Sequence, residues 1–97
     1  MFSVYVLQSE STGRFYIGST SDLARRLAEH NANLAIATKH RGPWRLVHQE
    51  SFPTRGAAMV RERYLKTGKG REEIQAILKG RAVSSTGRGR QGDTLNQ

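Results

Sequence analysis

Two tyrosines, an arginine and a histidine in the first third of the chain carry side chains that suit phosphate chemistry. Tyr5 and Tyr16 lie in two strand-like segments, so both phenols could reach one face of a sheet. Arg26 and His30 follow four residues apart, which places them on one stripe of a helix. A phenol can position a phosphate oxygen or, beside a cation, act as a general base. Half-buried structural tyrosines, a solvated arginine and a histidine at a helix C-terminus are the alternative interpretation.

A carboxylate that could join this group comes later in the sequence. Glu62 falls at the edge of the apolar face expected for a helix, beside Ala58 and Leu65. Desolvating a carboxylate is costly unless the group is paired or binds a metal ion. The spacing favours a salt bridge to an arginine, and a metal site is the alternative. Arg61 falls near the middle of the same face, and helical spacing offers no reason for a charge there.

A small α+β domain is expected to position these residues. Strands are expected at 2–8, 14–18 and 45–52, and helices at 21–31, 54–67 and 71–78. A turn-rich segment at 9–13 predicts that the first two strands form a hairpin. Ser21 or Asp22 could cap the first helix, and Thr54 the second. The order strand, strand, helix, strand, helix, helix predicts a three-stranded antiparallel sheet flanked by three helices.

The C-terminal residues differ in composition from the rest of the chain. Residues 81–97 are rich in Ser, Thr, Gly and Arg and contain almost no apolar side chains. We therefore expect one domain over residues 1–80 and a basic, disordered tail over residues 81–97. The tail arginines could add non-specific attraction to phosphates, and an inert terminus is the alternative.

The charge balance points to a polyanionic partner. The chain has a net charge of +8, and twelve of its sixteen basic residues are arginine, which can bind phosphate through two parallel hydrogen bonds. Nucleic acid is the leading expectation, and a charge that only aids solubility is the alternative. The residues expected to contact nucleic acid are Arg14, Arg25, Lys39, His40, Arg41 and Trp44. Trp44 could stack on a base or belong to the core.

Other features exclude several classes of protein. The chain has no cysteine, so disulfides and thiolate zinc sites are excluded. No apolar run approaches the ~18 residues of a membrane span, and the first residues do not resemble a signal peptide. A soluble cytoplasmic protein with no membrane contact is expected, with a monomer as the default state.

Taken together, these residues resemble the GIY-YIG nuclease family. Its two name-giving triplets are matched by Val4-Tyr5-Val6 and Tyr16-Ile17-Gly18, and the segment DLARRLAEHN follows at the family's distance. The stretch AAMVRERYLKTGKG is similar to the family's second-helix motif, with Glu62 at the acidic position. The likeness is greatest to small stand-alone members related to the N-terminal nuclease domain found in excinuclease ABC.

The resemblance implies a metal-dependent phosphodiesterase. Glu62 would hold one divalent ion, Mg²⁺ or Mn²⁺, at the scissile phosphate. Tyr5 would help to activate the attacking water and Tyr16 would orient water or phosphate. Arg26 would stabilise charge in the transition state, and His30 would assist proton transfer or phosphate binding. We expect these five side chains to converge on one basic face of the sheet.

The resulting hypothesis is an endonuclease that hydrolyses phosphodiester bonds in DNA with little sequence specificity, in DNA repair or processing. The sequence leaves open whether single-stranded, duplex or branched DNA, or RNA, is the substrate. The alternative is a catalytically weak or inactive nucleic-acid-binding module that acts within a larger complex. Its support is that residues 69–73 lack the asparagine that many family members carry after the acidic helix.

Overall fold

A computed structural model describes the backbone of residues 1–86 and the side chains of residues 1–80. The strands are β1 (Phe2–Ser9), β2 (Phe15–Thr20) and β3 (Trp44–Phe52). The helices are α1 (Leu23–Asn31), the 3₁₀ turn η1 (Ile36–Thr38), α2 (Arg55–Leu65) and α3 (Gly68–Thr86). The predicted order of strands and helices is confirmed, and η1 is added in a segment that had no predicted element. Within the described part of the chain, no helix is long and apolar enough to cross a membrane.

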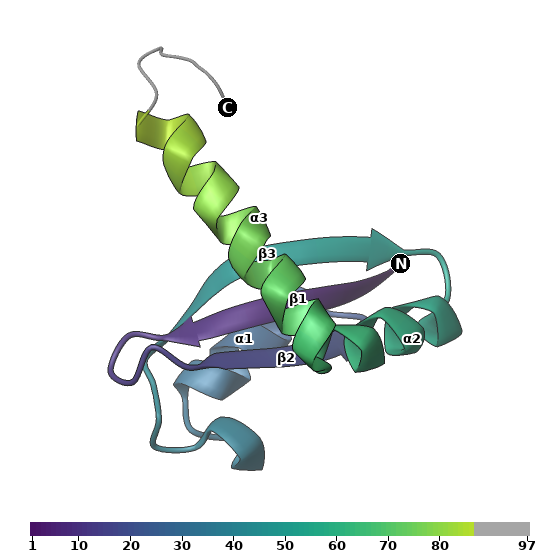
Figure 1. The fold of residues 1–97 in the computed structure, drawn as a ribbon. Coiled ribbons are helices and arrows are strands. Elements are labelled where there is room, and N and C mark those ends of the chain that lie inside the picture. Colours follow the sequence, from purple (N-terminus) through teal and green to yellow (C-terminus); the bar gives the residue numbers. More distant parts are fainter. Residues whose placement is uncertain (87–97) are drawn as a thin grey trace.

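The sheet has three antiparallel strands in the order β2-β1-β3, so β1 is central and β2 is an edge strand (Figure 1). The predicted hairpin pairs β1 with β2 and places Tyr5 opposite Gly18. The predicted fold class, a three-stranded antiparallel sheet flanked by helices, is therefore confirmed.

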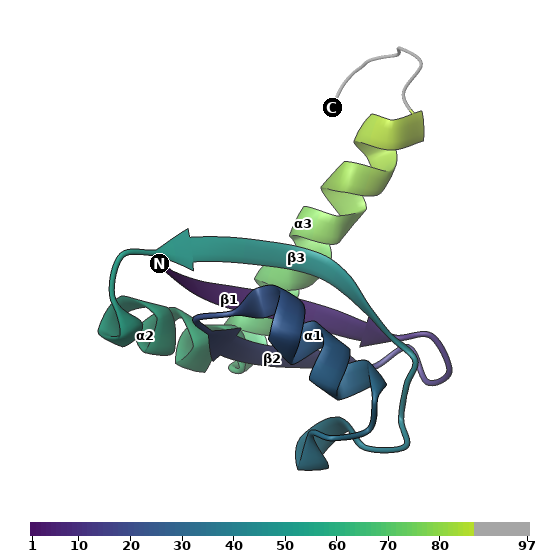
Figure 2. The same cartoon turned by 180° about the vertical axis from the view of Figure 1, so that it is seen from behind.

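Helices cover both faces of this sheet, α2 and α3 on one and α1 on the other (Figures 1 and 2). Because side chains alternate along a strand, β1 supplies both cores. One core contains Val4, Val6, Ile17, Ala58, Leu65 and Ile74. The other contains Tyr5, Leu7 and Trp44, with Tyr16, Leu23, Leu27 and Leu46 packed against them. Tyr5 thus belongs to the face that α1 covers.

The two helices that carry the polar candidates begin at the predicted caps. The side chain of Asp22 accepts a hydrogen bond from the amide of Arg25 at 3.1 Å, and Thr54 accepts one from Ala57 at 3.1 Å. Each bond satisfies one of the amides that a first helical turn leaves free. These caps fix where α1 and α2 begin, and so the turn on which each functional side chain lies.

The third helix is longer than predicted. It runs from Gly68 to Thr86, through Gly80, although the sequence predicted a helix over 71–78. A glycine inside a helix costs about 1 kcal/mol relative to alanine, which does not by itself end the helix. Gly70 lies against the end of α2, because an added Cβ would meet the backbone of Leu65 at 2.4 Å. The rest of the predicted tail, residues 87–97, lies outside the described residues.

The charge on the inner side of α2 has a structural explanation. Arg61 binds both carboxylate oxygens of Glu50 in β3, at 2.8 and 3.0 Å, and also binds Glu73 in α3. Hydrogen bonds from Arg61, opposed by burial and assisted by His48, hold the pKa of Glu50 below its ordinary value. The guanidinium therefore connects α2 to β3 and α3, and these partners, eleven or more residues away, were not evident from helical spacing.

Candidate active site

Tyr5 is the buried centre of the candidate site. Its ring lies across Gly18 on the neighbouring strand, and a Cβ added at Gly18 would stand 2.6 Å from the phenol oxygen and 2.7 Å from Cζ. Real Cβ atoms essentially never approach a neighbouring heavy atom this closely. Glycine at position 18 therefore leaves the space that the phenol occupies.

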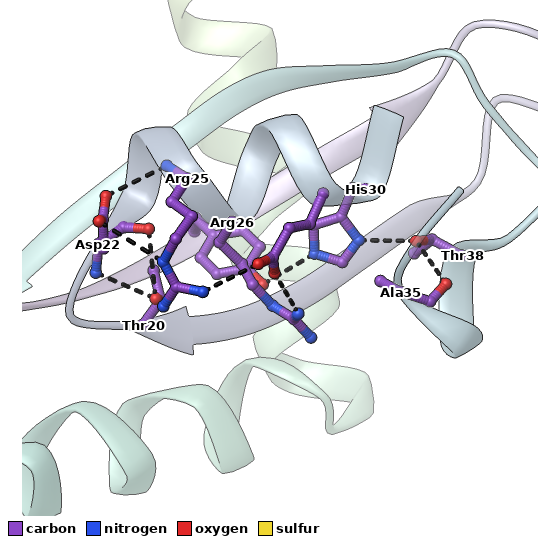
Figure 3. Close-up of polar contacts among 9 residues, drawn as sticks. Thr20, Asp22, Arg25, Arg26, His30, Ala35 and Thr38 are labelled. Carbon is purple, nitrogen blue, oxygen red and sulfur yellow. Dashed lines mark hydrogen bonds and ion pairs between the residues drawn. The ribbon is translucent and has the colours of Figure 1, made fainter. Parts of the chain in front are cut away.

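A chain of hydrogen bonds leads away from the phenol through His30 (Figure 3). The Tyr5 hydroxyl lies 3.0 Å from Nε2 of His30, and Nδ1 of His30 lies 2.6 Å from the Thr38 hydroxyl. That hydroxyl has a longer contact, 3.5 Å, in which it donates to the carbonyl of Ala35. Because the Thr38 hydroxyl donates its hydrogen to Ala35, it accepts a hydrogen bond from Nδ1–H of His30. Nε2 of His30 then carries the lone pair and accepts a hydrogen bond from the Tyr5 hydroxyl.

Arg26 lies near Tyr5, on the preceding turn of α1, and its positive charge acts on the phenol. Its guanidinium donates to Glu29 at 2.8 Å. Glu29 accepts a second bond, also at 2.8 Å, from Arg25, whose guanidinium lies 3.6 Å from Asp22 (Figure 3). The Tyr5 oxygen is therefore bonded to an imidazole and lies in the field of a nearby guanidinium.

Burial keeps both the Tyr5 phenol and the His30 imidazole neutral. Loss of solvent raises the pKa of Tyr5 to about 12, although the nearby Arg26 guanidinium opposes that rise. Burial, together with the positive charge of Arg26, lowers the pKa of His30. At neutral pH the pair therefore consists of a phenol and an unprotonated imidazole, which agrees with the direction of donation inferred from Thr38.

Tyr16 lies beside this chain and is only half-buried. Its ring centroid is 4.9 Å from that of His30 and 6.3 Å from that of Tyr5. The structure thus brings together four of the predicted site residues, Tyr5, Tyr16, Arg26 and His30, on the α1 face of the sheet.

Glu62, on α2, contacts strand β2 from the other side of the sheet. Ser19, the residue after Gly18, donates to Oε1 of Glu62 at 2.7 Å, and Lys66 donates to Oε2 at 2.8 Å. The expectation that all five side chains share one face is therefore wrong, because α2 packs on the other side of the sheet from α1. The two groups lie on opposite sides of β2, and the charge of Glu62 contributes to the raised pKa of Tyr5. Burial opposes ionisation of Glu62, but the bonds from Lys66 and Ser19 outweigh it and lower its pKa.

The surroundings of Glu62 suit a hard divalent cation. Among the residues described, no three His, Cys, Asp or Glu side chains cluster as metal ligands, so Glu62 would act alone. Mg²⁺ commonly uses one or two carboxylates and completes its octahedron with waters and substrate phosphates. Glu62 also borders an open hollow of about 150 Å³, with Met59, Arg63 and Lys66. Lys66 is largely exposed and could turn toward a phosphate, which would free one carboxylate oxygen.

The residues expected to contact nucleic acid have different positions. Arg14, Arg25, Lys39, His40 and Arg41 are exposed, as binding to phosphates requires. Trp44 is 6% exposed and donates its indole N–H to the Thr38 carbonyl at 3.1 Å. The suggestion that Trp44 stacks on a base is therefore wrong, because its ring belongs to the core.

Sequence reasoning did not identify three residues that contact the site. Thr38 lies in a segment without periodicity and gave no signal. Ser19 directly follows the second triplet, and Lys66 is four residues beyond Glu62, a spacing that predicts an ion pair on a helix. The last two could therefore have been proposed from their spacing.

The family model for the GIY-YIG catalytic domain matches residues 1–75, which include all of these positions. The chain belongs to the GIY-YIG family. A solved relative, the UPF0213 protein BH0048 of Bacillus halodurans, studied by solution NMR, superposes with a TM-score of 0.50 at 33% identity. That alignment covers 79% of this chain and 85% of the relative, and it supports the same α+β fold.

Two sequence relatives show how this GIY-YIG chain compares in length. It is 46% identical over 67 residues to a UPF0213 protein of Halobacterium salinarum, a match that covers 68% of this chain and 86% of the relative. It is 44% identical over 72 residues to the structure-specific endonuclease subunit SLX1 of Meyerozyma guilliermondii. That match covers 67% of this chain but only 24% of the SLX1 protein.

Proposed function

We propose that this GIY-YIG chain is a divalent-metal-dependent endonuclease that hydrolyses DNA with little sequence specificity, in DNA repair or processing. The observation that carries the proposal is the buried hydrogen bond between Tyr5 and His30, with Arg26 nearby and Glu62 bonded to Ser19 of the adjacent strand β2. Membership of the family, the endonuclease named among its relatives and the net charge of +8 add support.

The contacts of Tyr5 suggest a proton relay. A phenol with a pKa of about 12 is a poor base by itself at neutral pH. Its oxygen can accept a proton from the attacking water only as its own proton passes to Nε2 of His30. The water oxygen then bonds to phosphorus while the bond to the leaving oxygen breaks. In this scheme His30 is the final proton acceptor and Tyr5 transmits the proton.

Positive charge beside the phenol supports the same step. The Arg26 guanidinium can stabilise the phenol oxygen as negative charge develops on it, and it can also bind a non-bridging phosphate oxygen. Glu62 would hold the divalent ion, with Ser19 fixing the orientation of the carboxylate. When bound, such an ion neutralises charge at the scissile phosphate and on the leaving oxygen.

The test compares Glu62→Ala with wild type on single-stranded, duplex and branched DNA, with and without Mn²⁺. We expect the variant to lose cleavage while it keeps most of its affinity for DNA, because the basic surface is unchanged. Glu72→Ala serves as the matched control, since Glu72 is an exposed carboxylate on α3. Undiminished cleavage by Glu62→Ala would refute the role given to this residue.

A binding module without catalysis is the second candidate. Its support is the contact of the Lys66 ammonium with Glu62 at 2.8 Å, since the protein already supplies a cation to the carboxylate. DNA binding with no product in any of these conditions would favour this candidate over the nuclease.

A further inference from the structure

The turn η1 and the segment just before it present two apolar side chains to solvent. Ile36 is 93% exposed and Leu34 is 72% exposed, and within residues 1–80 no other large apolar side chain is as exposed as Ile36. Both overall views show η1, the short blue turn, projecting beyond β2 on the side away from β3 (Figures 1 and 2). The candidate site also lies at β2, which carries Tyr16 and the Ser19 hydroxyl that bonds Glu62.

This projecting segment is fixed to the site by specific contacts. The last residue of η1, Thr38, bonds His30 through its hydroxyl and Trp44 through its carbonyl. The residues on either side of η1 are also joined, because the side chain of Asn33 accepts a hydrogen bond from the amide of His40 at 3.0 Å. Ile36 therefore has a defined position, two residues from a direct partner of His30.

The residues that follow η1 are basic. Lys39, His40 and Arg41 are consecutive and exposed, so this segment would lie along a phosphate backbone. In an intact duplex the base faces are stacked on one another, so Ile36 could reach only phosphates, sugars and the edges of bases. The faces of the bases are apolar, but they become accessible only where stacking is interrupted, and apolar side chains of DNA-binding proteins enter at such steps.

We propose that Ile36, with Leu34 beside it, is a wedge that contacts an exposed base face next to the scissile phosphate. The preferred substrate is then DNA whose base stack is interrupted there, at a branch, a flap or an unpaired end. This inference rests on the proposed function for the chemistry, but it makes its own prediction about binding.

The test measures binding in EDTA, where no cleavage can occur. The two ligands are a continuous duplex and a branched DNA with the same arm sequences. We expect wild type to prefer the branched DNA, and Ile36→Ser to reduce that preference by about tenfold, the size expected for burial of one isoleucine side chain. Val60→Ser is the matched control, because Val60 is an apolar residue that is 63% exposed on α2, and its preference should equal that of wild type.

A fluorescent base analogue, 2-aminopurine, placed at the branch reports unstacking directly. Wild type should raise its fluorescence, and Ile36→Ser should not. Equal affinity of wild type for both DNAs, or an unchanged preference in Ile36→Ser, would overturn the wedge, and the second result is expected if Ile36 serves a protein partner. Selective binding that depends on Ile36, combined with no cleavage of the same DNAs when Mg²⁺ or Mn²⁺ replaces EDTA, would support the wedge while refuting the nuclease.

Discussion

Replacing Thr38 tests whether the hydrogen-bond chain is functional, because Thr38 touches His30 but not the phenol. Thr38→Val keeps the shape of the side chain and removes the hydroxyl that lies 2.6 Å from Nδ1. In the wild-type protein this bond favours the tautomer whose Nε2 can accept a proton. A hydrogen bond worth about 1.4 kcal/mol corresponds to a tenfold preference between tautomers.

We therefore expect Thr38→Val to lower kcat/KM by about tenfold. It should also reduce the free energy of unfolding by about 1–3 kcal/mol, because Nδ1 becomes a buried polar group without a partner. Thr38→Ser is the control, since it keeps the hydroxyl and should recover most of the rate. A purely structural role would lower stability in both variants without separating their rates.

The assay is cleavage of a fluorescent DNA under single-turnover conditions, measured from pH 5 to pH 9. Burial lowers the pKa of His30 from its ordinary value of about 6.5, so the wild-type rate should rise with pH and reach its plateau near neutrality. Thr38→Val should have a lower rate at every pH, and its rate should level off at a lower plateau. A plateau equal to that of wild type would refute the relay through His30.

Two further predictions concern the packing around the phenol. Gly18→Ala places a methyl group 2.6 Å from the Tyr5 oxygen, so it should cost about 1–3 kcal/mol of stability and abolish most cleavage; thermal unfolding and cleavage unchanged from wild type would contradict this. The pKa of His30 is lower in the folded protein, so the unfolded chain binds a proton at this residue more readily. The contribution of neutral His30 to stability is therefore complete above about pH 6.5, and it is lost as the pH falls toward the pKa of the folded state. Urea unfolding at pH 5 and pH 8 should show a smaller pH dependence in His30→Gln than in wild type, with the exposed His40→Gln as control; equal pH dependence in all three would contradict it.

Local pattern accounts for the elements that the sequence predicted correctly. Alternation in residues 2–8 and a turn-rich connection define the hairpin, and Asp22 and Thr54 identify the starts of two helices. These features depend on neighbours within a few residues, so they are visible without tertiary information. The same holds for the stripe that carries Arg26 and His30.

The errors concern relations between distant segments. Helical phase places Glu62 at the edge of an apolar face, but it does not say which side of the sheet that helix covers. Trp44 follows a basic loop, and only its burial against Thr38 shows that it belongs to the core. Thr38 acts through a single buried contact, so neither its type nor its spacing could indicate its position.

The placement of the candidate site across β2 connects cleavage to complete folding. One half comes with α1 and the other with α2, and each helix packs on its own side of the sheet. A chain that has docked only one of these helices keeps its positive charge and can still bind nucleic acid. It lacks either Arg26 and His30 or Glu62, so on the proposed mechanism an incompletely folded molecule would bind DNA without cutting it.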